Sequence, residues 1–408
     1  MKTTKQIETE YSISRQTLNK WIKYKVISSP KKDWRGWYCW DKENEEEIQS
    51  ILTTKEEQYN TVQGELFKEE EELETLHIFN RRYLGSKKKL LNFILETVKE
   101  YDNQIYSVAD IFSGTGVVAD QFRQKGKKVI LNDILKSNYV TYHTWFGNEE
   151  IDENKIQKRL HELNKVEGTE NYVSLNFGDK YFTMENAKKI GEIRERIELM
   201  DDLNIREKSF LLTSLIYAMD KVANTVGHYD AYRRTLDTYN PLILKMPLVN
   251  KNNDNEIFCE DANQLVRKIK ADLVYIDTPY NSRQYGDAYH LLENIINWEK
   301  PPVIGVAKKM PDRSGTKSLY STSKAPLAFN DLVEHIDAKY ILVSYSNMAK
   351  KGNARSNAKI SNEEIINILK QRGKVQVFES SFNPFTTGKS VIEDHKELLY
   401  LCEVGIRE

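Results

Sequence analysis

The stretch "YSVADIFSGTGVVADQFRQKGKKVILND", residues 106–133, constrains the fold more than any other part of this chain. An apolar run reaches residue 112 and meets two glycines, Gly114 and Gly116, before the helical sequence "VVADQFRQK" begins. That helix stops at Gly126, and a second apolar run, "KKVILND", ends at Asp133. Strand, glycine turn, helix and strand in this order predict an α/β domain with a parallel sheet.

The same alternation continues to the end of the chain. Further apolar runs read "ADLVYID", "KYILVSYS", "KVQVFESS" and "KELLYLCEV", each with the composition of a strand. Between about 145 and 255 the sequence is largely helical and interrupts the succession of strands. We therefore expect an α/β domain over residues 78–145 and 256–408, with residues 146–255 inserted as a helical block.

Composition bounds the class of protein. A chain of 408 residues is long enough for two or three domains. Its net charge is -1, but residues 41–75 are strongly acidic, so the remainder carries a basic excess that suits nucleic acid. It contains no run of about 18 apolar residues and starts with a polar segment, so we expect a cytoplasmic protein without a membrane span. The scattered cysteines and histidines predict neither a disulfide framework nor a metal site.

Residues 1–55 are predicted to be a small separate unit. Thr3 and Gln6 have the spacing of a capping box, and Ser14 is placed to cap a second helix. Two short helices, the second polar on its outer face, predict a winged helix-turn-helix that binds DNA and resembles the MerR type. The alternative is a three-helix cap with a solvated face. The expected DNA contacts are Arg15, Gln16, Asn19, Lys20 and Lys23, and an acidic linker is expected over residues 56–77.

The glycine turn predicts a nucleotide-like cofactor. Glycines at a strand-to-helix turn allow close approach to the backbone, and the helix N-terminus offers free amides. Asp133, about 20 residues further on, is placed to bind ribose hydroxyls. This pattern by itself fits both NAD and S-adenosylmethionine.

Three further motifs favour chemistry on an amine. They are "RRYLGSKKKLL" at residues 81–91, "FCEDANQL" at 258–265 and "DTPY" at 277–280. An exocyclic amine on adenine is a poor nucleophile, and two acceptors on its hydrogens, the Asp277 carboxylate and the Thr278 carbonyl, would draw out its lone pair. Pro279 biases Thr278 away from helix, so that its carbonyl points outward. Tyr280 is then expected to stack on the face of a flipped base.

From about residue 80 onward the chain resembles the Dam-like class of adenine-specific DNA methyltransferases. "YLGSK", "DIFSGTG" and "DTPY" occur in the order that this class uses, although Thr278 stands where many relatives carry proline. The resemblance implies a Rossmann-like methyltransferase fold, a seven-stranded mixed sheet with a reversed final strand, here "KELLYLCEV". It also implies that Asp277, Thr278, Pro279 and Tyr280 form the target-adenine pocket. Expected to bind S-adenosylmethionine are Tyr83, Gly85, Lys87, Asp110, Phe112, Gly114, Gly116, Asp133, Asp261 and Ala262.

Two polar segments are candidates for recognition of the DNA target. The resemblance places the recognition module in the helical block, whose segment 220–234 offers arginines for guanine edges or phosphates and an asparagine for adenine. A structural helix-loop with solvated arginines is the alternative. The lysine-bearing segment 311–326 is expected either to grip the target strand or to be a surface loop. The predicted contacts are Asn224, His228, Tyr229, Tyr232, Arg233, Arg234 and Arg283.

These motifs predict an enzyme that methylates N6 of adenine in double-stranded DNA with S-adenosylmethionine. It would act within a restriction-modification system, with a cognate restriction endonuclease as partner, or as an orphan methylase. One alternative keeps the chemistry on an RNA or protein-amide substrate. A second is a DNA-binding regulator whose methyltransferase domain is secondary.

Overall fold

The chain divides into two compact units, Met1–Leu73 and Glu74–Glu408. The computed structural model describes residues 2–11, 18–19, 21–22, 27–33, 35–50, 75–236, 239–346, 358–381 and 396–405. Arg15, Gln16, Lys20 and Lys23, and the acidic stretch 56–74, lie outside these residues. The predicted cap Ser14 does so too.

The first unit contains a small three-stranded sheet in the order β1-β3-β2. At the start of α1, Thr3 N donates to Gln6 Oε1 at 2.8 Å and Gln6 N donates to Thr3 Oγ1 at 3.4 Å, so the predicted capping box forms. Residues 42–50 are also helical, and Asn19 is exposed. A core of five buried side chains, Ile7, Leu18, Ile27, Trp40 and Ile48, holds the unit together. Its elements are β1 (Lys2–Thr3), α1 (Thr4–Tyr11), β2 (Lys31–Lys32) and β3 (Tyr38–Trp40).

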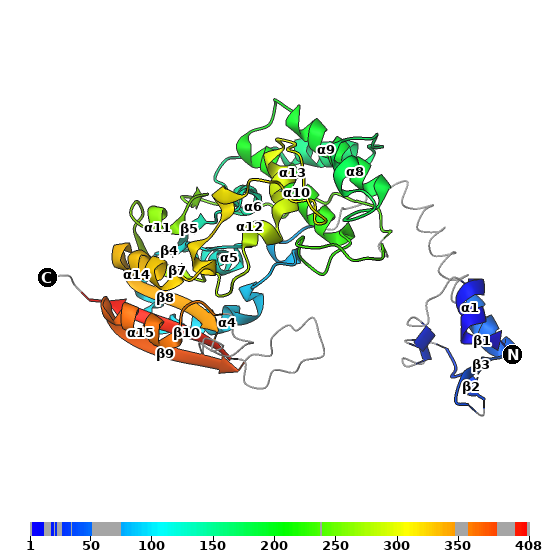
Figure 1. The fold of residues 1–408 in the computed structure, drawn as a ribbon, viewed down its shortest axis with the longest axis horizontal. Helices are drawn as coiled ribbons and strands as arrows, with labels where there is room; N and C mark the ends of the chain where they lie inside the picture. Colours follow the sequence, from blue (N-terminus) through cyan, green and yellow to red (C-terminus); the bar gives the residue numbers. More distant parts are fainter. Residues whose placement is uncertain are drawn as a thin grey trace. The chain divides into compact units, whose positions relative to one another are not determined.

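The second unit is built on a seven-stranded sheet in the order β6-β5-β4-β7-β8-β10-β9 (Figure 1). Strands β4 to β8 pair in parallel, whereas β10 runs antiparallel to both of its neighbours. The predicted mixed sheet with a reversed final strand is therefore confirmed. In chain order the strands are β4 (Ser107–Asp110), β5 (Lys128–Asn132), β6 (Glu256–Phe258), β7 (Ala271–Ile276), β8 (Ala338–Ser346), β9 (Gly373–Ser381) and β10 (Lys396–Val404).

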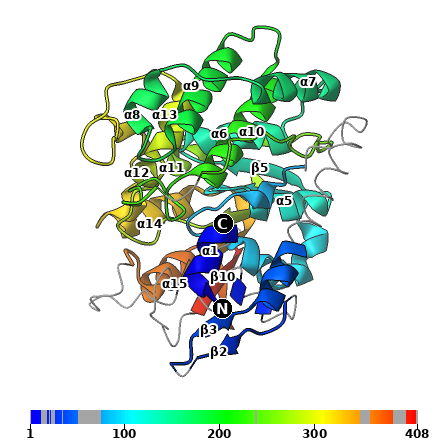
Figure 2. The same cartoon turned by 90° about the vertical axis from the view of Figure 1, so that its right-hand side faces the viewer.

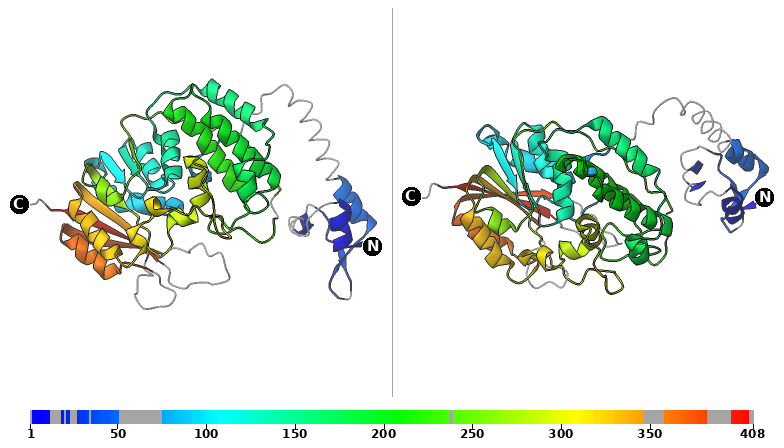
Figure 3. Two further views of the ribbon diagram at one scale, coloured as in Figure 1. Left: turned by 45° about the horizontal axis from the view of Figure 1, so that its top comes forward. Right: turned by 90° about the horizontal axis from the view of Figure 1, so that it is seen from above.

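Alternate residues of the strands point to opposite faces of the sheet, and each face has its own hydrophobic core. In β7, Leu273 and Tyr275 join one core, whereas Val274 and Ile276 join the other. Because side chains in a strand alternate between faces, apolar residues at every position require helices on both sides. Figure 3 shows the resulting layers, with the strands between helices.

The helices divide between the two faces. The first core contains side chains from α4 (Leu91–Thr97), α5 (Val117–Gln124), α6 (Lys136–Phe146) and α13 (His290–Asn297). The second contains side chains from α11 (Ala262–Leu265), α14 (Ala325–His335) and α15 (Asn362–Lys370). The short elements are η1 (Ile78–Asn80), η2 (Lys87–Leu90), η3 (Lys99–Gln104), α12 (Tyr285–Ala288), η4 (Ser314–Thr316) and η5 (Leu319–Ser321).

Four helices of the predicted helical block follow one another and gather beside α6 (Figure 2). Each starts at a polar residue whose side chain accepts a backbone hydrogen bond in the first turn, namely Asp152, Asn171, Thr183 and Asn204. The last of them ends at Val222, and the described part of residues 223–255 contains no helix. The block is therefore helical over a shorter span than predicted. Its helices are α7 (Glu153–Asn164), α8 (Tyr172–Phe177), α9 (Met184–Glu198) and α10 (Ile205–Val222).

Leu76, which the sequence places in the acidic linker, instead belongs to the second unit. Its side chain is buried in the first core. Its N–H donates to Met246 O at 2.8 Å, and its carbonyl accepts from Leu248 N at 2.8 Å. The linker prediction extends too far at this end because local acidity does not reveal an apolar residue that pairs with a distant segment.

Gly116 and Gly126 have the same left-handed backbone conformation, but only Gly116 lies in the glycine turn. Comparing the two therefore tests how close packing in that turn affects stability. Gly116 has φ 81°, and an added Cβ would lie 3.1 Å from the buried ring of Phe146. Gly126 has φ 77°, with nothing within 4 Å of such a Cβ. We expect Gly126→Ala to cost about 1–2 kcal/mol through backbone strain alone, and Gly116→Ala to cost about 1 kcal/mol more because a buried ring cannot move freely.

Urea denaturation of the two variants and the parent measures this difference as a shift in midpoint. Equal midpoints for both variants would show that Phe146 yields to the added methyl group.

Candidate active site

A cavity lies where the parallel strands end, and its empty space, together with the open solvent at its mouth, is about 980 Å³. Its walls come from the residues that follow β4, β5, β6 and β7, which is the edge of a parallel sheet where ligands bind in this class of fold. All four residues of "DTPY" line it. So do nine predicted cofactor residues, namely Tyr83, Gly85, Lys87, Asp110, Phe112, Gly114, Asp133, Asp261 and Ala262.

Gly116 is the predicted cofactor residue that does not line the cavity. It is the N-cap of α5, and the space beside it is filled by the side chains of Phe146 and Ile78. Glycine is required at this position because the backbone has positive φ and the interior is close-packed. The prediction of a cofactor contact at Gly116 is therefore replaced by a structural role in the turn.

Gly114 brings the backbone of the turn against the motif "YLGSK". Its φ is 54°, and a Cβ would lie 3.0 Å from the ring of Tyr83. Its N–H donates to Asp133 Oδ2 at 3.1 Å, and its carbonyl accepts from the hydroxyl of Tyr142 at 2.7 Å. The glycine turn is thus hydrogen-bonded to Asp133 at the end of β5, which fixes the position of the backbone that lines the cavity.

Asp133 is held by hydrogen bonds from three sides. Besides Gly114, Leu135 N donates to Oδ1 at 2.8 Å and Asn138 Nδ2 donates to Oδ2 at 3.0 Å. Burial raises the pKa of Asp133 to about 6, although these hydrogen bonds favour its ionised form. The same Asn138 amide donates to the hydroxyl of Tyr83 at 3.0 Å. Asn138 therefore orients two of the predicted cofactor residues at once.

Asp110, at the end of β4, is a buried acid whose charge is not compensated. Asp110 is 1% exposed, and no side chain donates to its carboxylate; the backbone N–H groups of Phe112 and Ala119 favour its ionised form but make no hydrogen bond of ordinary geometry to it. Burial, followed by the charges of Asp277 and Asp133, raises the pKa of Asp110 to about 8. An unsatisfied carboxylate facing a cavity is suited to a cationic or hydrogen-donating ligand.

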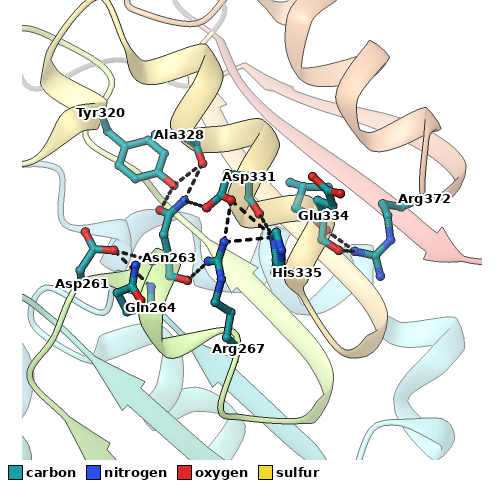
Figure 4. A network of polar contacts seen from close by, with 11 residues as sticks. Asp261, Asn263, Gln264, Arg267, Tyr320, Ala328, Asp331, Glu334, His335 and Arg372 are labelled. Carbon is teal, nitrogen blue, oxygen red and sulfur yellow. Dashed lines mark hydrogen bonds and ion pairs between the residues drawn. The ribbon is translucent and has the colours of Figure 1, made fainter.

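Asp261 and Phe112 form a further part of the cavity wall. Asp261 Oδ1 accepts from the backbone N–H groups of Asn263 and Gln264, at 3.0 and 3.2 Å, and so caps the short helix α11. Figure 4 shows this carboxylate at one end of a polar network that continues through Asn263. The ring of Phe112 meets that of Tyr320 edge-on, with centroids 5.1 Å apart. An acceptor beside an aromatic face is suited to a flat, amine-bearing ring.

The predicted catalytic motif, residues 277–280, begins directly after β7. Asp277 Oδ1 lies 2.8 Å from Nζ of Lys87, which the sequence assigned to the cofactor. Burial raises the pKa of Asp277, and the charge of Lys87 partly offsets that rise. Burial, the largest influence on Lys87, lowers its pKa, but the charges of Asp277 and Glu397 outweigh burial and raise that pKa overall. The two side chains are close enough to form an ion pair within the wall of the cavity.

The other residues of the motif shape the wall beside this pair. Thr278 is buried. Tyr280 is half-buried, and its ring meets that of Tyr345 at 76°, with centroids 6.2 Å apart. One side of the Tyr280 ring is therefore supported from β8. A supported aromatic ring beside a carboxylate is an arrangement that can hold a planar base.

Residues 83–357 match the family model of the D12 class N6 adenine-specific DNA methyltransferases. The chain belongs to this family. Modification methylase StsI of Streptococcus sanguinis is 37% identical over 311 residues, which are 71% of this chain and 46% of StsI. Type II methyltransferase M.NlaIII of Neisseria lactamica is 31% identical over 341 residues, 79% of this chain and 98% of that protein. Type II methyltransferase M.FokI of Planomicrobium okeanokoites is 32% identical over 348 residues, 78% of this chain and 52% of that protein.

The chain thus spans about half the length of StsI and M.FokI and nearly all of M.NlaIII. Among the described helices of this D12-class protein, none is long and apolar enough to cross a membrane. In the same part of the chain, no group of three His, Cys, Asp or Glu side chains is arranged to hold a metal ion.

Two of the predicted DNA contacts are structural. Asn224 is buried, and its amide donates to the carbonyls of Lys180 and Arg233 at 2.9 and 3.0 Å. Tyr229 is also buried, and its hydroxyl donates to Asp220 Oδ1 at 2.7 Å. The prediction that these two side chains read DNA is wrong for this structure, because both are buried and the Asn224 amide nitrogen and the Tyr229 hydroxyl already donate within the protein.

The remaining candidates in this segment lie at the surface or close to it. Arg233 and Arg234 are exposed, His228 is partly exposed, and the ring of Tyr232 packs against Tyr181 with centroids 5.1 Å apart. The segment therefore offers cationic groups to a partner, while its aromatic residues support the loop.

A cluster of ion pairs joins this segment to the region after "DTPY". Asp230 pairs with Lys309 at 2.7 Å and with Arg283 at 3.8 Å. Asp287 pairs with Arg313 at 2.5 Å. The sequence pointed to Arg283 but not to Lys309 or Arg313, because nothing in a linear sequence shows that three separate loops meet.

Several cavity residues escaped the sequence analysis. Tyr285, Thr316, Ser318 and Tyr320 line the cavity, and Asn138 supports it from α6. Asn138 stands five residues after Asp133 in "DILKSN", so its spacing from that acid was the one available signal.

The buried carboxyl of Asp110 predicts a trade-off between stability and binding, because its ionised form is unfavourable in the folded protein unless a cationic ligand is bound. Its native carboxyl keeps its proton up to about pH 8, whereas an unfolded aspartate releases it near 4. Its contribution to the free energy of unfolding therefore falls as pH rises through that window. We expect Asp110→Asn to raise the melting temperature at pH 7 by about 2–4 °C and to weaken binding of a cationic ligand.

Thermal unfolding between pH 5 and 9 tests this expectation, with the gain largest at the alkaline end. A gain that does not change with pH would mean that Asp110 does not titrate in this window.

Proposed function

We propose that this protein is a site-specific DNA adenine methyltransferase. It transfers the methyl group of S-adenosylmethionine to N6 of an adenine that is flipped out of duplex DNA. The proposal rests on the observation that two groups of residues line one cavity. One is Asp277 with its partner Lys87, and the other is the acids Asp110 and Asp133 near the glycine turn. Membership of the D12 class supports adenine N6 as the acceptor.

The cavity residues fit S-adenosylmethionine. The unsatisfied carboxylate of Asp110 suits the cationic part of the cofactor, and Asp133 suits its ribose hydroxyls. Asp261 suits the amine edge of its adenine ring, and Phe112 suits the face of that ring. When bound, the cofactor supplies an activated methyl group on a sulfonium.

Asp277 prepares the acceptor amine. One of its oxygens pairs with Lys87, so the other is available to accept a hydrogen bond from N6 of the target base. The Thr278 carbonyl would accept from the second amine hydrogen, and the two acceptors together draw the lone pair out of the ring. The charge of Asp277 also stabilises the positive charge that develops on nitrogen during transfer. No stronger base is required, because orientation and electrostatics lower the barrier.

The DNA-facing surface is proposed to include the cationic groups around Asp230 and Asp287. Arg283, Lys309 and Arg313 come from the segments that flank the base pocket. Arg233 and Arg234 lie on the neighbouring loop. Phosphate contacts by such groups would orient the duplex, while base-specific contacts set the recognised sequence.

The first experiment is expression of the chain in a host that lacks adenine methylation, followed by single-molecule sequencing of the genome. We expect N6-methyladenine in one short sequence context, which would also identify the target. An unmethylated genome in cells that contain soluble protein would turn the assignment toward an RNA substrate.

Asp277→Asn tests the catalytic role. It keeps the size of the side chain but removes its charge, so we expect methyl transfer to fall by at least about 100-fold while S-adenosylhomocysteine still binds. Transfer rates on target DNA and calorimetric binding of S-adenosylhomocysteine measure the two effects separately. Near-normal transfer by the variant would disprove the assignment of "DTPY" as the catalytic motif.

We further propose that residues 1–55 form a DNA-binding unit that adds contacts outside the target or controls a promoter. The small sheet, the capped helix α1 and the exposed Asn19 support this reading. We expect a chain lacking these residues to methylate the same sequence, with weaker DNA binding at low salt. Gel shifts of both chains test this, and equal affinities would contradict it.

The names of the relatives support a place in a restriction-modification system. Three of them are called modification methylase or type II methyltransferase. We propose a cognate restriction endonuclease as partner, with an orphan methylase as the alternative. Protection of host DNA against a nuclease encoded beside this gene would separate the two.

A further inference from the structure

The segment 314–321, called here the wall segment, lies between the two halves of the cavity. The sequence left open whether this region grips DNA or is a surface loop. In the structure it forms η4 and η5, and three of its side chains, Thr316, Ser318 and Tyr320, line the cavity. It is therefore part of the site.

On the cofactor side, the wall segment is anchored through Tyr320. Tyr320 is 3% exposed, and its hydroxyl donates to Asn263 Oδ1 at 2.8 Å. The amide of Asn263 in turn donates to Ala328 O at 2.8 Å and to Asp331 Oδ2 at 2.7 Å (Figure 4). These bonds fix the Tyr320 ring edge-on to Phe112 and connect it to the helix that Asp261 caps. Tyr320 is thus oriented at the place proposed for the cofactor's adenine.

On the target side, the wall segment is bound to the loop that follows Tyr280. Gln284 Nε2 donates to Ser318 O at 3.1 Å, and Ser318 N donates to Gln284 Oε1 at 2.8 Å. Ser321 Oγ donates to Arg283 O at 3.0 Å. This reciprocal bonding by one amide side chain holds the two segments in register, as a pair of strands would be held.

Close packing adds to these hydrogen bonds. A Cβ on Gly286 would lie 2.0 Å from Thr316 Oγ1, so the two backbones approach where no side chain fits between them. Displacement of the wall segment therefore has to move residues 283–286 as well.

We propose that Tyr320 is a further cofactor-contacting residue and that Gln284 is a positioning residue, which couples cofactor binding to DNA binding by holding the wall segment against the loop after Tyr280. The inference rests on the proposed function. Because Tyr320 is fixed in the wall segment, a cofactor that packs on Tyr320 stabilises the position of the wall segment and, through Gln284, that of residues 283–286. DNA that binds residues 283–286 in this position then binds more tightly, and the linkage is reciprocal.

The coupling is measured with S-adenosylhomocysteine as probe. Calorimetry on the full chain gives its dissociation constant alone and in the presence of a duplex that carries the sequence methylated in cells. We expect the duplex to tighten binding by about five-fold or more in the parent. In Gln284→Leu the duplex should change the dissociation constant of S-adenosylhomocysteine by less than about two-fold. Without DNA, that constant should stay within about two-fold of the parent's.

Thr322→Ala is the matched control. It removes the bond from Thr322 Oγ1 to Leu319 O at 2.7 Å and the bond that Thr322 Oγ1 accepts from Lys324 N at 3.1 Å, neither of which reaches residues 283–286. This variant should keep the coupling of the parent. Full coupling in Gln284→Leu, or its loss in Thr322→Ala as well, would overturn the role of Gln284.

Two variants test Tyr320 without DNA. Tyr320→Leu keeps apolar bulk but loses the flat ring, and we expect about ten-fold weaker binding of S-adenosylhomocysteine. Tyr320→Phe keeps the ring but loses its anchor on Asn263, and about three-fold weaker binding is expected. Binding by a folded Leu variant within two-fold of the parent would overturn the assignment, and the Phe variant decides by the same criterion if the Leu variant does not fold.

Failure of this inference is distinguishable from failure of the proposed function. If the parent binds S-adenosylhomocysteine but methylates and binds no duplex, the proposed function itself is wrong. If it binds the duplex and the affinity for S-adenosylhomocysteine does not change, only the coupling is wrong.

Discussion

The concentration of carboxylates at the ends of neighbouring parallel strands is the constraint on which the rest of the site depends. Asp110, Asp133 and Asp277 end or follow β4, β5 and β7, and all three line one cavity. Burial raises the pKa of each, and the charges of Asp277 and Asp133 add to the rise at Asp110. Lys87 compensates one of these charges directly. The cavity therefore favours a cationic ligand, which matches a sulfonium cofactor with an ammonium group.

The shape of the cavity is maintained by contacts between segments far apart in sequence. The ring of Tyr83 stacks on that of Tyr289 with centroids 4.6 Å apart, and the Tyr289 hydroxyl accepts from Leu84 N at 2.9 Å. Nearby, the Arg81 guanidinium pairs with Asp220 at 3.0 Å and bonds Asn138 at 3.0 Å. Residues 81–84, which precede the sheet, are thus held by Tyr289, Asn138 and the end of α10, all of which lie far from them in the sequence.

Sequence reasoning succeeded where function follows from local backbone geometry. A glycine turn after a strand, an acid at the next strand end and proline after Asp277 act over a few residues, and the structure places them around one cavity. It failed for Asn224 and Tyr229, whose residue types suit DNA contacts but whose hydrogen bonds are used within the protein. Burial depends on the whole chain, so a polar residue type alone cannot show which partner it serves.

By itself, the sequence determined the α/β class and the motifs of the cavity, because apolar runs and a glycine turn are local properties, whereas the seven-stranded mixed sheet was implied by the resemblance to a family. Only the tertiary structure decided that Lys87 pairs with Asp277, that Gly116 supports α5 instead of the cavity, and that residues 314–321 form a wall of the site. Each of these depends on contacts between residues separated by long stretches of chain. Such contacts are settled by packing and by competition for hydrogen bonds, which no short stretch of sequence displays.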